Sequence, residues 1–139
     1  MKQKSWRPLP LLVLLLAIGG CGSGSGLVNV QGRLTYKGQP VPSTYVLFCP
    51  EDGKRASRGM TDDDGSFTLA NSRDDMGVFI GRHTVVLKYK VGAEEETHQT
   101  GPKASKELRD IIAKYADQKT STLKYEVKHG GQTIDINLE

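Results

Sequence analysis

A recurring alternation of apolar and polar residues constrains the fold of this chain more than any other feature of its sequence. It runs through four stretches, residues 28–36, 85–91, 123–127 and 134–138. A period of two is typical of strands that bury one face and expose the other to water. Residues 44–49 are apolar on both faces, which predicts a central strand, and 56–61 and 67–69 add two shorter strands. The chain is therefore predicted to be all-β, a seven-stranded and mainly antiparallel sandwich.

Turn-forming residues separate these strands. Glycine occurs in each of the segments 37–40, 63–65 and 129–132, and the last of these links the final two strands. In each strand, the apolar residues at every second position are predicted to face the core. A shift of the strand by one residue would turn all of them toward the solvent, so the alternation fixes which face is buried. Its expected members are Val28, Val30, Leu34, Phe67, Val85, Leu87, Tyr125, Val127, Ile134 and Ile136.

One short helix is expected in the long connection 92–121. Its apolar residues are Leu108, Ile111, Ile112 and Tyr115, which follow the spacing i, i+3, i+4, i+7. This spacing places them on one face of a helix, and we expect that face to pack on the sandwich.

The first twenty residues have the composition of a secretory signal peptide. Residues 1–7 contain basic but no acidic side chains, and an apolar run follows at 9–18. A membrane-spanning helix needs roughly 20 apolar residues, whereas the centre of a signal peptide needs only about 7–15. Residues 1–20 are therefore predicted to be absent from the mature protein.

The leader ends in Ile18, Gly19 and Gly20, which directly precede Cys21. This segment resembles the lipobox of bacterial lipoproteins, in which leucine is most usual at the position of Ile18. The resemblance implies that the Cys21 sulfur receives a diacylglycerol and that Cys21 becomes the first residue of the mature chain. Residues 21–26 would then be the lipidated cysteine and a short, flexible Gly/Ser tether. Residues 27–139 would form one domain, held on the exported face of the cell membrane or the outer membrane.

Removal of the leader would also remove the charge imbalance of the chain. Lys2, Lys4 and Arg7 account for the excess of 19 Lys and Arg over 16 Asp and Glu. Because the mature chain would be formally neutral, its composition gives no argument for a nucleic-acid partner or an electrostatic membrane patch.

Four motifs occur in order along the folded part: GRLTYKGQPVP at 32–42, VLFCP at 46–50, TDDDGSF at 61–67 and GGQTID at 130–135. Together they resemble the carboxypeptidase regulatory-like domain of small bacterial lipoproteins. Lys114, Tyr115, Asp117, Thr120, Ser121 and Leu123 match a further segment of these proteins, whereas Ala113 stands where a proline often precedes the Lys-Tyr pair. The resemblance covers residues 27–139 and implies a transthyretin-like (prealbumin-like) sandwich without a known common activity.

The run Asp-Asp-Asp-Gly at 62–65 resembles part of a calcium-binding loop. The positions of an EF-hand that supply the first and last ligands correspond to Met60 and Asn71, which are poor ligands there. We therefore interpret the run as a hairpin turn in which aspartate accepts backbone N–H groups and glycine adopts a positive φ. Asp62 and Asp64 are kept as weak calcium candidates.

No catalytic residue, resident metal or cofactor is predicted. The spacing of His83, His98 and His129 is not that of zinc ligands, and no strand–turn–helix nucleophile elbow occurs. Cys49 lies inside an apolar run and is predicted to be a buried, inert side chain.

A few residues are candidates for contacts with other molecules. Tyr45 and Tyr115 are expected to be the exceptions among aromatic rings that otherwise face the core, and Glu94, Glu95 and Glu96 are expected to form a solvated loop tip.

Together these features predict a non-catalytic, lipid-anchored protein of the cell envelope. Its partners would be the membrane, through the lipid on Cys21, and other envelope proteins, in a structural or protein-interaction role. The alternative is a ligand-binding module for a glycan or for weakly bound calcium. Glycan platforms usually rely on exposed aromatic rings, and the only tryptophan, Trp6, lies in the leader.

Overall fold

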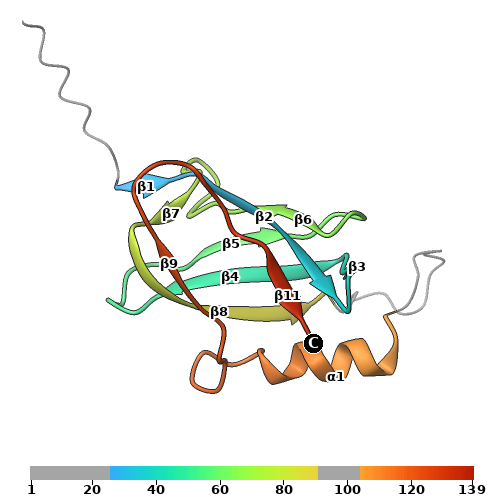
Figure 1. Cartoon of the computed structure of the whole chain (residues 1–139). Coiled ribbons are helices and arrows are strands. Elements are labelled where there is room, and N and C mark those ends of the chain that lie inside the picture. Colours follow the sequence, from blue (N-terminus) through green and yellow to red (C-terminus); the bar gives the residue numbers. More distant parts are fainter. Residues whose placement is uncertain (1–25, 91–103) are drawn as a thin grey trace, which may run out of the picture.

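The computed structural model describes residues 26–90 and 104–139, which form eleven strands and one helix (Figure 1). The strands are β1 (Leu27–Val28), β2 (Val30–Tyr36), β3 (Gln39–Pro40), β4 (Thr44–Pro50), β5 (Ser57–Met60), β6 (Ser66–Thr68), β7 (Val78–Phe79), β8 (Gly81–Tyr89), β9 (Lys124–Val127), β10 (Gln132–Thr133) and β11 (Ile136–Leu138). The helix is α1 (Lys106–Lys114), inside the connection where one was predicted.

The strands form two main sheets. The first has the order β5-β4-β8-β9 and is antiparallel throughout. The second is built around β2, which pairs antiparallel with β3 and β6 and parallel with β10 and β11. A small antiparallel ladder joins β1 to β7. The predicted all-β, mainly antiparallel class is confirmed.

The segment 129–132 links its two strands in an unexpected way. It connects β9 of the first sheet to β10, which pairs with β2 in the second sheet, so the chain crosses between sheets instead of folding back as a hairpin. After this crossing, the C-terminal strands β10 and β11 run parallel to β2.

The number of strands in the described residues is eleven, and the prediction of seven is not confirmed. The seven expected strands correspond to β2, β4, β5, β6, β8, β9 and β11. The four others, β1, β3, β7 and β10, contain two residues each. Ladders this short give no period-two signal in a sequence.

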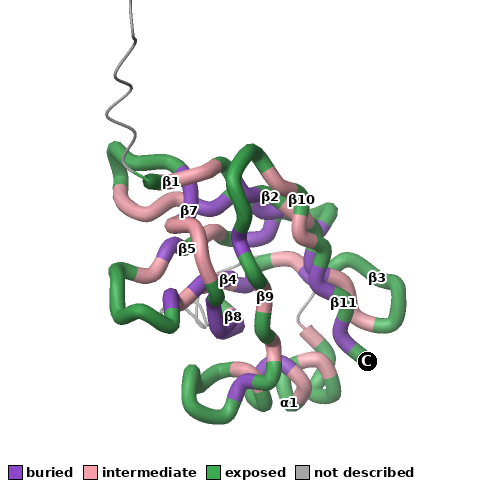
Figure 2. Tube along the Cα trace, turned by 60° about the vertical axis from the view of Figure 1, so that its left-hand side comes forward, coloured by how far each residue is buried: buried purple, intermediate pink, exposed green. Residues whose placement is uncertain are grey.

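The core lies between the two main sheets and draws side chains from both (Figure 2). Seven of the expected core residues are fully buried: Val30, Leu34, Phe67, Val85, Leu87, Val127 and Ile136. Val28, Tyr125 and Ile134 are half-buried and pack against this cluster. The parity of the strands therefore predicted the inward face correctly.

Strand β4 is central in the first sheet, as predicted, between β5 and β8. Its inward face is fully buried, whereas Tyr45, Leu47 and Cys49 on the other face are half-buried. The prediction that Cys49 is buried is wrong, because the second sheet covers only one face of β4. Partial burial nevertheless raises the pKa of the Cys49 thiol, which favours its protonated form.

The helix and the segment that follows it cover the edge of β8 beyond the point where β9 ends. Leu87 donates its N–H to the carbonyl of Tyr115 (3.0 Å), and Val85 donates to the carbonyl of Leu123 (2.8 Å). The buried Ser121 hydroxyl donates to the carbonyl of Val85 (2.5 Å). These bonds replace a strand partner, so this edge is not open to pairing with another chain.

Helix α1 begins with a capping residue and an acidic first turn. The Ser105 side chain accepts the Leu108 N–H (3.1 Å). In the first turn, Glu107 Oε1 accepts hydrogen bonds from the Tyr36 hydroxyl and the Lys37 ammonium, both at 2.7 Å. The Lys37 bond lowers the pKa of Glu107, and together these contacts join the helix to the β2–β3 hairpin.

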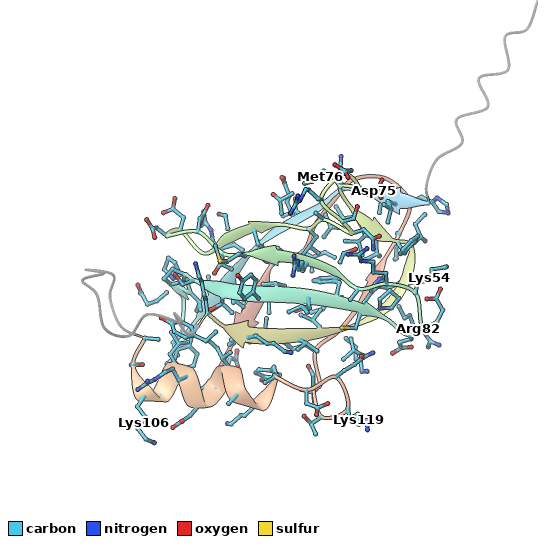
Figure 3. All side chains as sticks on the ribbon, turned by 180° about the vertical axis from the view of Figure 1, so that it is seen from behind. Lys54, Asp75, Met76, Arg82, Lys106 and Lys119 are labelled. Carbon is cyan, nitrogen blue, oxygen red and sulfur yellow. The ribbon has the colours of Figure 1, made fainter. Side chains whose placement is uncertain are left out.

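Two large hydrophobic side chains are exposed in the described residues, Met60 at the end of β5 and Met76 in the loop before β7 (Figure 3 labels Met76). No helix in these residues is long and apolar enough to cross a membrane.

Candidate functional site

The residues singled out from the sequence do not come together in one place. Cys21 and the acidic run Glu94, Glu95 and Glu96 lie outside the described residues. Tyr45 is half-buried on the outer face of β4, opposite Met60 and Lys88 of the neighbouring strands. Its predicted place away from the core agrees with the structure.

Two predictions concern Tyr115: that it belongs to the helix face that packs on the sandwich, and that its ring is an exception among the core-facing aromatic rings. The first is confirmed and the second is wrong. Tyr115 caps the C-terminal end of α1, and its ring packs against the core cluster. The helical spacing put Tyr115 on the same face as Ile112, which is buried, so the ring follows that face inward. Its position therefore favours a structural role.

The 62–65 turn has the geometry of the predicted hairpin turn. Asp62 Oδ1 accepts the N–H groups of Asp64 (3.0 Å) and Ser66 (2.8 Å), and Gly65 has a φ of 74°. The Asp62 carbonyl also accepts the Gly65 N–H (2.9 Å). The Asp62 carboxylate thus already satisfies two backbone donors, which competes with its use as a metal ligand.

Replacing Asp62 by alanine is expected to lower the free energy of unfolding by about 1 kcal/mol, because two N–H groups lose their acceptor. Urea denaturation of the variant measures this loss. Asp63→Ala is the matched control, since its side chain forms no hydrogen bond among the described residues, and it should change stability by less than about 0.5 kcal/mol. A rise in the melting temperature of the wild type with micromolar calcium, lost in Asp62→Ala, would contradict the turn interpretation.

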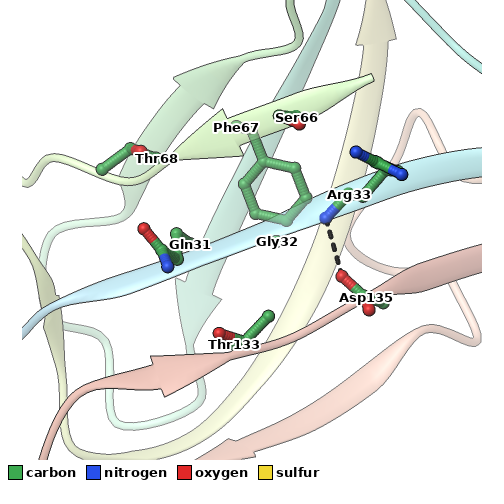
Figure 4. Close-up of a pocket in the computed structure, with 8 residues that line it drawn as sticks. All are labelled: Gln31, Gly32, Arg33, Ser66, Phe67, Thr68, Thr133 and Asp135. Atoms are coloured by element: carbon green, nitrogen blue, oxygen red, sulfur yellow. Dashed lines mark hydrogen bonds between the residues drawn. The ribbon is translucent and has the colours of Figure 1, made fainter. Parts of the chain in front are cut away.

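A shallow depression of about 350 Å³ lies on the second sheet (Figure 4). It is lined by Gln31, Gly32, Arg33, Ser66, Phe67, Thr68, Thr133 and Asp135. These residues come from β2, from β6, from β10 and from the segment that joins β10 to β11. Sequence reasoning did not find this group, because it combines parts of the chain about 100 residues apart.

The depression coincides with a break in the parallel pairing of β2. Between the pairs Thr133–Gln31 and Ile136–Leu34, the Asp135 side chain accepts the Arg33 N–H (2.9 Å). A Cβ on Gly32 would lie 1.9 Å from the Ile134 carbonyl oxygen, so only glycine fits there. The hydrogen bond of Asp135 and the missing side chain of Gly32 therefore both allow the C-terminal strands to lie close to β2.

The lining of the depression is suited to hydrogen bonding. Its polar groups are the guanidinium of Arg33, the carboxylate of Asp135, the amide of Gln31 and three hydroxyls. Phe67, the aromatic residue in the lining, is 3% exposed and belongs to the core. The surface can hold a polar ligand by hydrogen bonds, and it presents no aromatic ring on which a sugar could stack.

His83 is a buried polar residue on the inward face of β8. Its Nδ1 donates to the Gly81 carbonyl (2.9 Å), which leaves Nε2 as an acceptor without a hydrogen-bond partner among the described residues. The ring is 1% exposed and lies 5.8 Å from the ring of Phe48. Burial lowers the pKa of His83 below its ordinary value, although the bond to Gly81 acts in the opposite direction. His83 shares the parity of Val85 and Leu87, a signal that predicts its inward position.

We expect the free energy of unfolding to decrease at acidic pH because of the buried His83. Because its pKa is lower in the folded state, the unfolded chain binds the proton first, and the free energy of unfolding decreases as the pH falls below about 6.5. The slope for one proton is at most about 1.4 kcal/mol per pH unit. Chemical denaturation between pH 7.5 and 5.5 measures it. The slope should be smaller in His83→Leu than in the wild type; an equal slope in the two proteins would refute this assignment.

The described residues contain no group of three or more His, Cys, Asp or Glu side chains placed to hold a metal ion. Ser121, Asp62 and Asp135 are each hydrogen-bonded to backbone groups of the fold.

Comparisons with protein-family models, with curated proteins and with solved structures found no match for this chain.

Proposed function

We propose that this chain is a lipid-anchored protein of the bacterial cell envelope, attached through Cys21, with a sandwich that serves structure or protein contacts. The proposal rests on how soon after Cys21 the fold begins. Leu27 already pairs with Phe79, and β1 begins only six residues after Cys21. A cysteine that follows an apolar leader and directly precedes a folded domain is in the position that an anchor requires.

A diacylglycerol on Cys21 would be sufficient for attachment. One acyl chain gives only marginal membrane binding, and stable anchoring takes two. The modification supplies both chains, so that the described fold needs no membrane-spanning element of its own.

The proposal of a non-catalytic role is supported by the use of the polar residues. The side chains of Ser121, Asp62 and Asp135 each form a hydrogen bond with the backbone. The bond of Ser121 is at the edge of β8, that of Asp62 is in a turn, and that of Asp135 is at the break in the pairing of β2. His83 is enclosed by the core.

We infer from the resemblance of the motifs that the sandwich is of the prealbumin-like, carboxypeptidase regulatory-like type, and the two packed sheets agree with this inference.

Export and cell fractionation test the anchor. The wild-type protein is expected in the membrane fraction, and Cys21→Ala is expected to lose lipid attachment and normal processing. Cys49→Ala is the matched control, because it removes the other cysteine and should leave the distribution unchanged. Equal distribution of wild type and Cys21→Ala would contradict the proposal.

A further inference from the structure

The point at which the chain enters the sandwich lies beside a group of basic and apolar residues. Leu27 pairs with Phe79, and the Lys54 ammonium lies 5.3 Å from the centre of the Phe79 ring. Ile80 and Arg82 follow in the chain and line a hollow of about 370 Å³ together with the turn after β4. We call Leu27, Lys54, Phe79, Ile80 and Arg82 the entry patch. Lys54 and Arg82 lie together at one end of the molecule (Figure 3).

Basic groups outnumber acidic groups around this patch. Four exposed cations occur here, Lys54, Arg55, Arg82 and Lys124. The acids near them are Glu51, which lies 3.4 Å from Arg82 and 3.6 Å from Lys124, and Asp52, which lies 2.7 Å from Lys54. A third acid, the exposed Glu126, is opposite Arg82 in the pairing of β8 with β9. Four cations and three acids leave a local excess of one positive charge.

The acidic run 62–64 lies at the other end of the first sheet. The run Asp62, Asp63 and Asp64 follows Met60, which pairs with Tyr45 at the far end of β4. Five residue steps along β4 separate Tyr45 from Pro50, a distance of about 17 Å. Asp74 and Asp75 lie in the loop between β6 and β7.

The covalent chain limits how far the patch can lie from an anchor at Cys21. Six residue steps connect Cys21 to Leu27, and a fully extended chain spans at most about 3.6 Å per residue, or roughly 22 Å. A lipid on Cys21 would therefore hold Leu27, and with it the entry patch, next to the headgroups of the bilayer.

We propose that the entry patch docks on the headgroup layer of an anionic bilayer, with Phe79 and Ile80 at the surface and Lys54 and Arg82 against the lipid phosphates. This inference rests on the proposed lipid anchor and adds an orientation to it. Basic side chains are attracted to anionic leaflets, and apolar side chains next to them favour the interface. The acidic 62–64 turn then faces away from the membrane.

Tryptophan fluorescence in vesicles tests this orientation. The processed protein would contain no tryptophan after removal of Trp6, so Ile80→Trp provides a single reporter beside the existing hollow. Met60→Trp is the matched control, at the exposed far end of β5. In phosphatidylglycerol vesicles with brominated acyl chains, we expect strong quenching of Ile80→Trp and weak quenching of Met60→Trp. Equal quenching of the two would overturn the proposal.

Charge variants test the electrostatic part. In the Ile80→Trp background, Lys54→Gln with Arg82→Gln should lower the ratio of docked to undocked protein by about 5-fold per cation removed. Lys106→Gln with Arg109→Gln removes two charges from the helix and should leave the ratio unchanged. Equal losses in both pairs, or quenching that is the same on phosphatidylcholine vesicles, would overturn the proposal.

Mass spectrometry of the same sample distinguishes a failure of the docking proposal from a failure of the lipid anchor. If Cys21 is lipidated and Ile80→Trp is not quenched, the docking proposal fails alone. If Cys21 carries no lipid, the anchor itself fails.

Discussion

Phe48→Ala is expected to lower the free energy of unfolding by about 3–5 kcal/mol, the largest effect we predict for a single side chain. Phe48 is completely buried between the sheets, where its ring lies 5.8 Å from His83 and 6.1 Å from Tyr125. Its removal loses buried apolar area and leaves a cavity that the surrounding strands fill only in part. Because the free energy of unfolding of such domains is only about 5–15 kcal/mol, this loss would be a large share of it.

Urea denaturation of Phe48→Ala and of Met60→Ala measures this difference. Met60 is exposed on β5 in the same sheet, so its truncation should cost less than about 0.5 kcal/mol. Similar losses in the two variants would mean that the inward and outward faces of this sheet are assigned wrongly.

Gly32→Ala is expected to destabilise the fold by about 1–3 kcal/mol or more, although it adds a single methyl group. The new Cβ would lie 1.9 Å from the Ile134 carbonyl oxygen and 2.9 Å from the ring of Phe67. The clash with Ile134 is with backbone, so β2 and the C-terminal segment must move apart. This movement would also weaken the bond from the Arg33 N–H to Asp135.

The matched control is Gly131→Ala. The nearest atom to its added Cβ is the Asn29 carbonyl oxygen at 3.9 Å, an ordinary contact distance. Thermal unfolding should show a clearly lower midpoint for Gly32→Ala and a change of less than about 1 kcal/mol for Gly131→Ala. Equal midpoints would refute the close passage of the last strands along β2.

Local patterns predicted the parts of the fold that depend on neighbouring residues. Period-two alternation located the long strands and their buried faces, and a helical spacing located α1. The turn at 62–65 followed from the hydrogen-bonding capacity of aspartate and from the freedom of glycine. In each case the signal lies within about ten residues of sequence.

Features that join distant segments could not be predicted in this way. The parallel pairing of β2 with β10 and β11, and the bond from Arg33 to Asp135, connect residues 102 positions apart. Nothing in the alternation of 134–138 says whether this strand follows β9 or crosses to β2. The depression beside Gly32 arises from that crossing, so it became visible only in the folded chain.

Burial of single side chains was also misjudged where it depends on the second layer. Cys49 lies in an apolar strand, and its exposure depends on the absence of a further layer over that face of β4. Tyr115 is a candidate exposed ring among the aromatic residues, yet it packs on the core, as the helical spacing predicts, because the end of the helix lies against β8. Sequence patterns give the face of an element, and the tertiary packing decides what covers it.

Intact mass spectrometry of the membrane-extracted protein tests the lipid anchor at Cys21. We expect a chain whose first residue is Cys21 and whose mass exceeds that of residues 21–139 by an attached diacylglycerol, with the lipid located on the N-terminal peptide. Cys21→Ala should carry no such mass. An unmodified Cys21, or a mature chain that begins at another residue, would contradict the lipid anchor and the membrane orientation inferred from it.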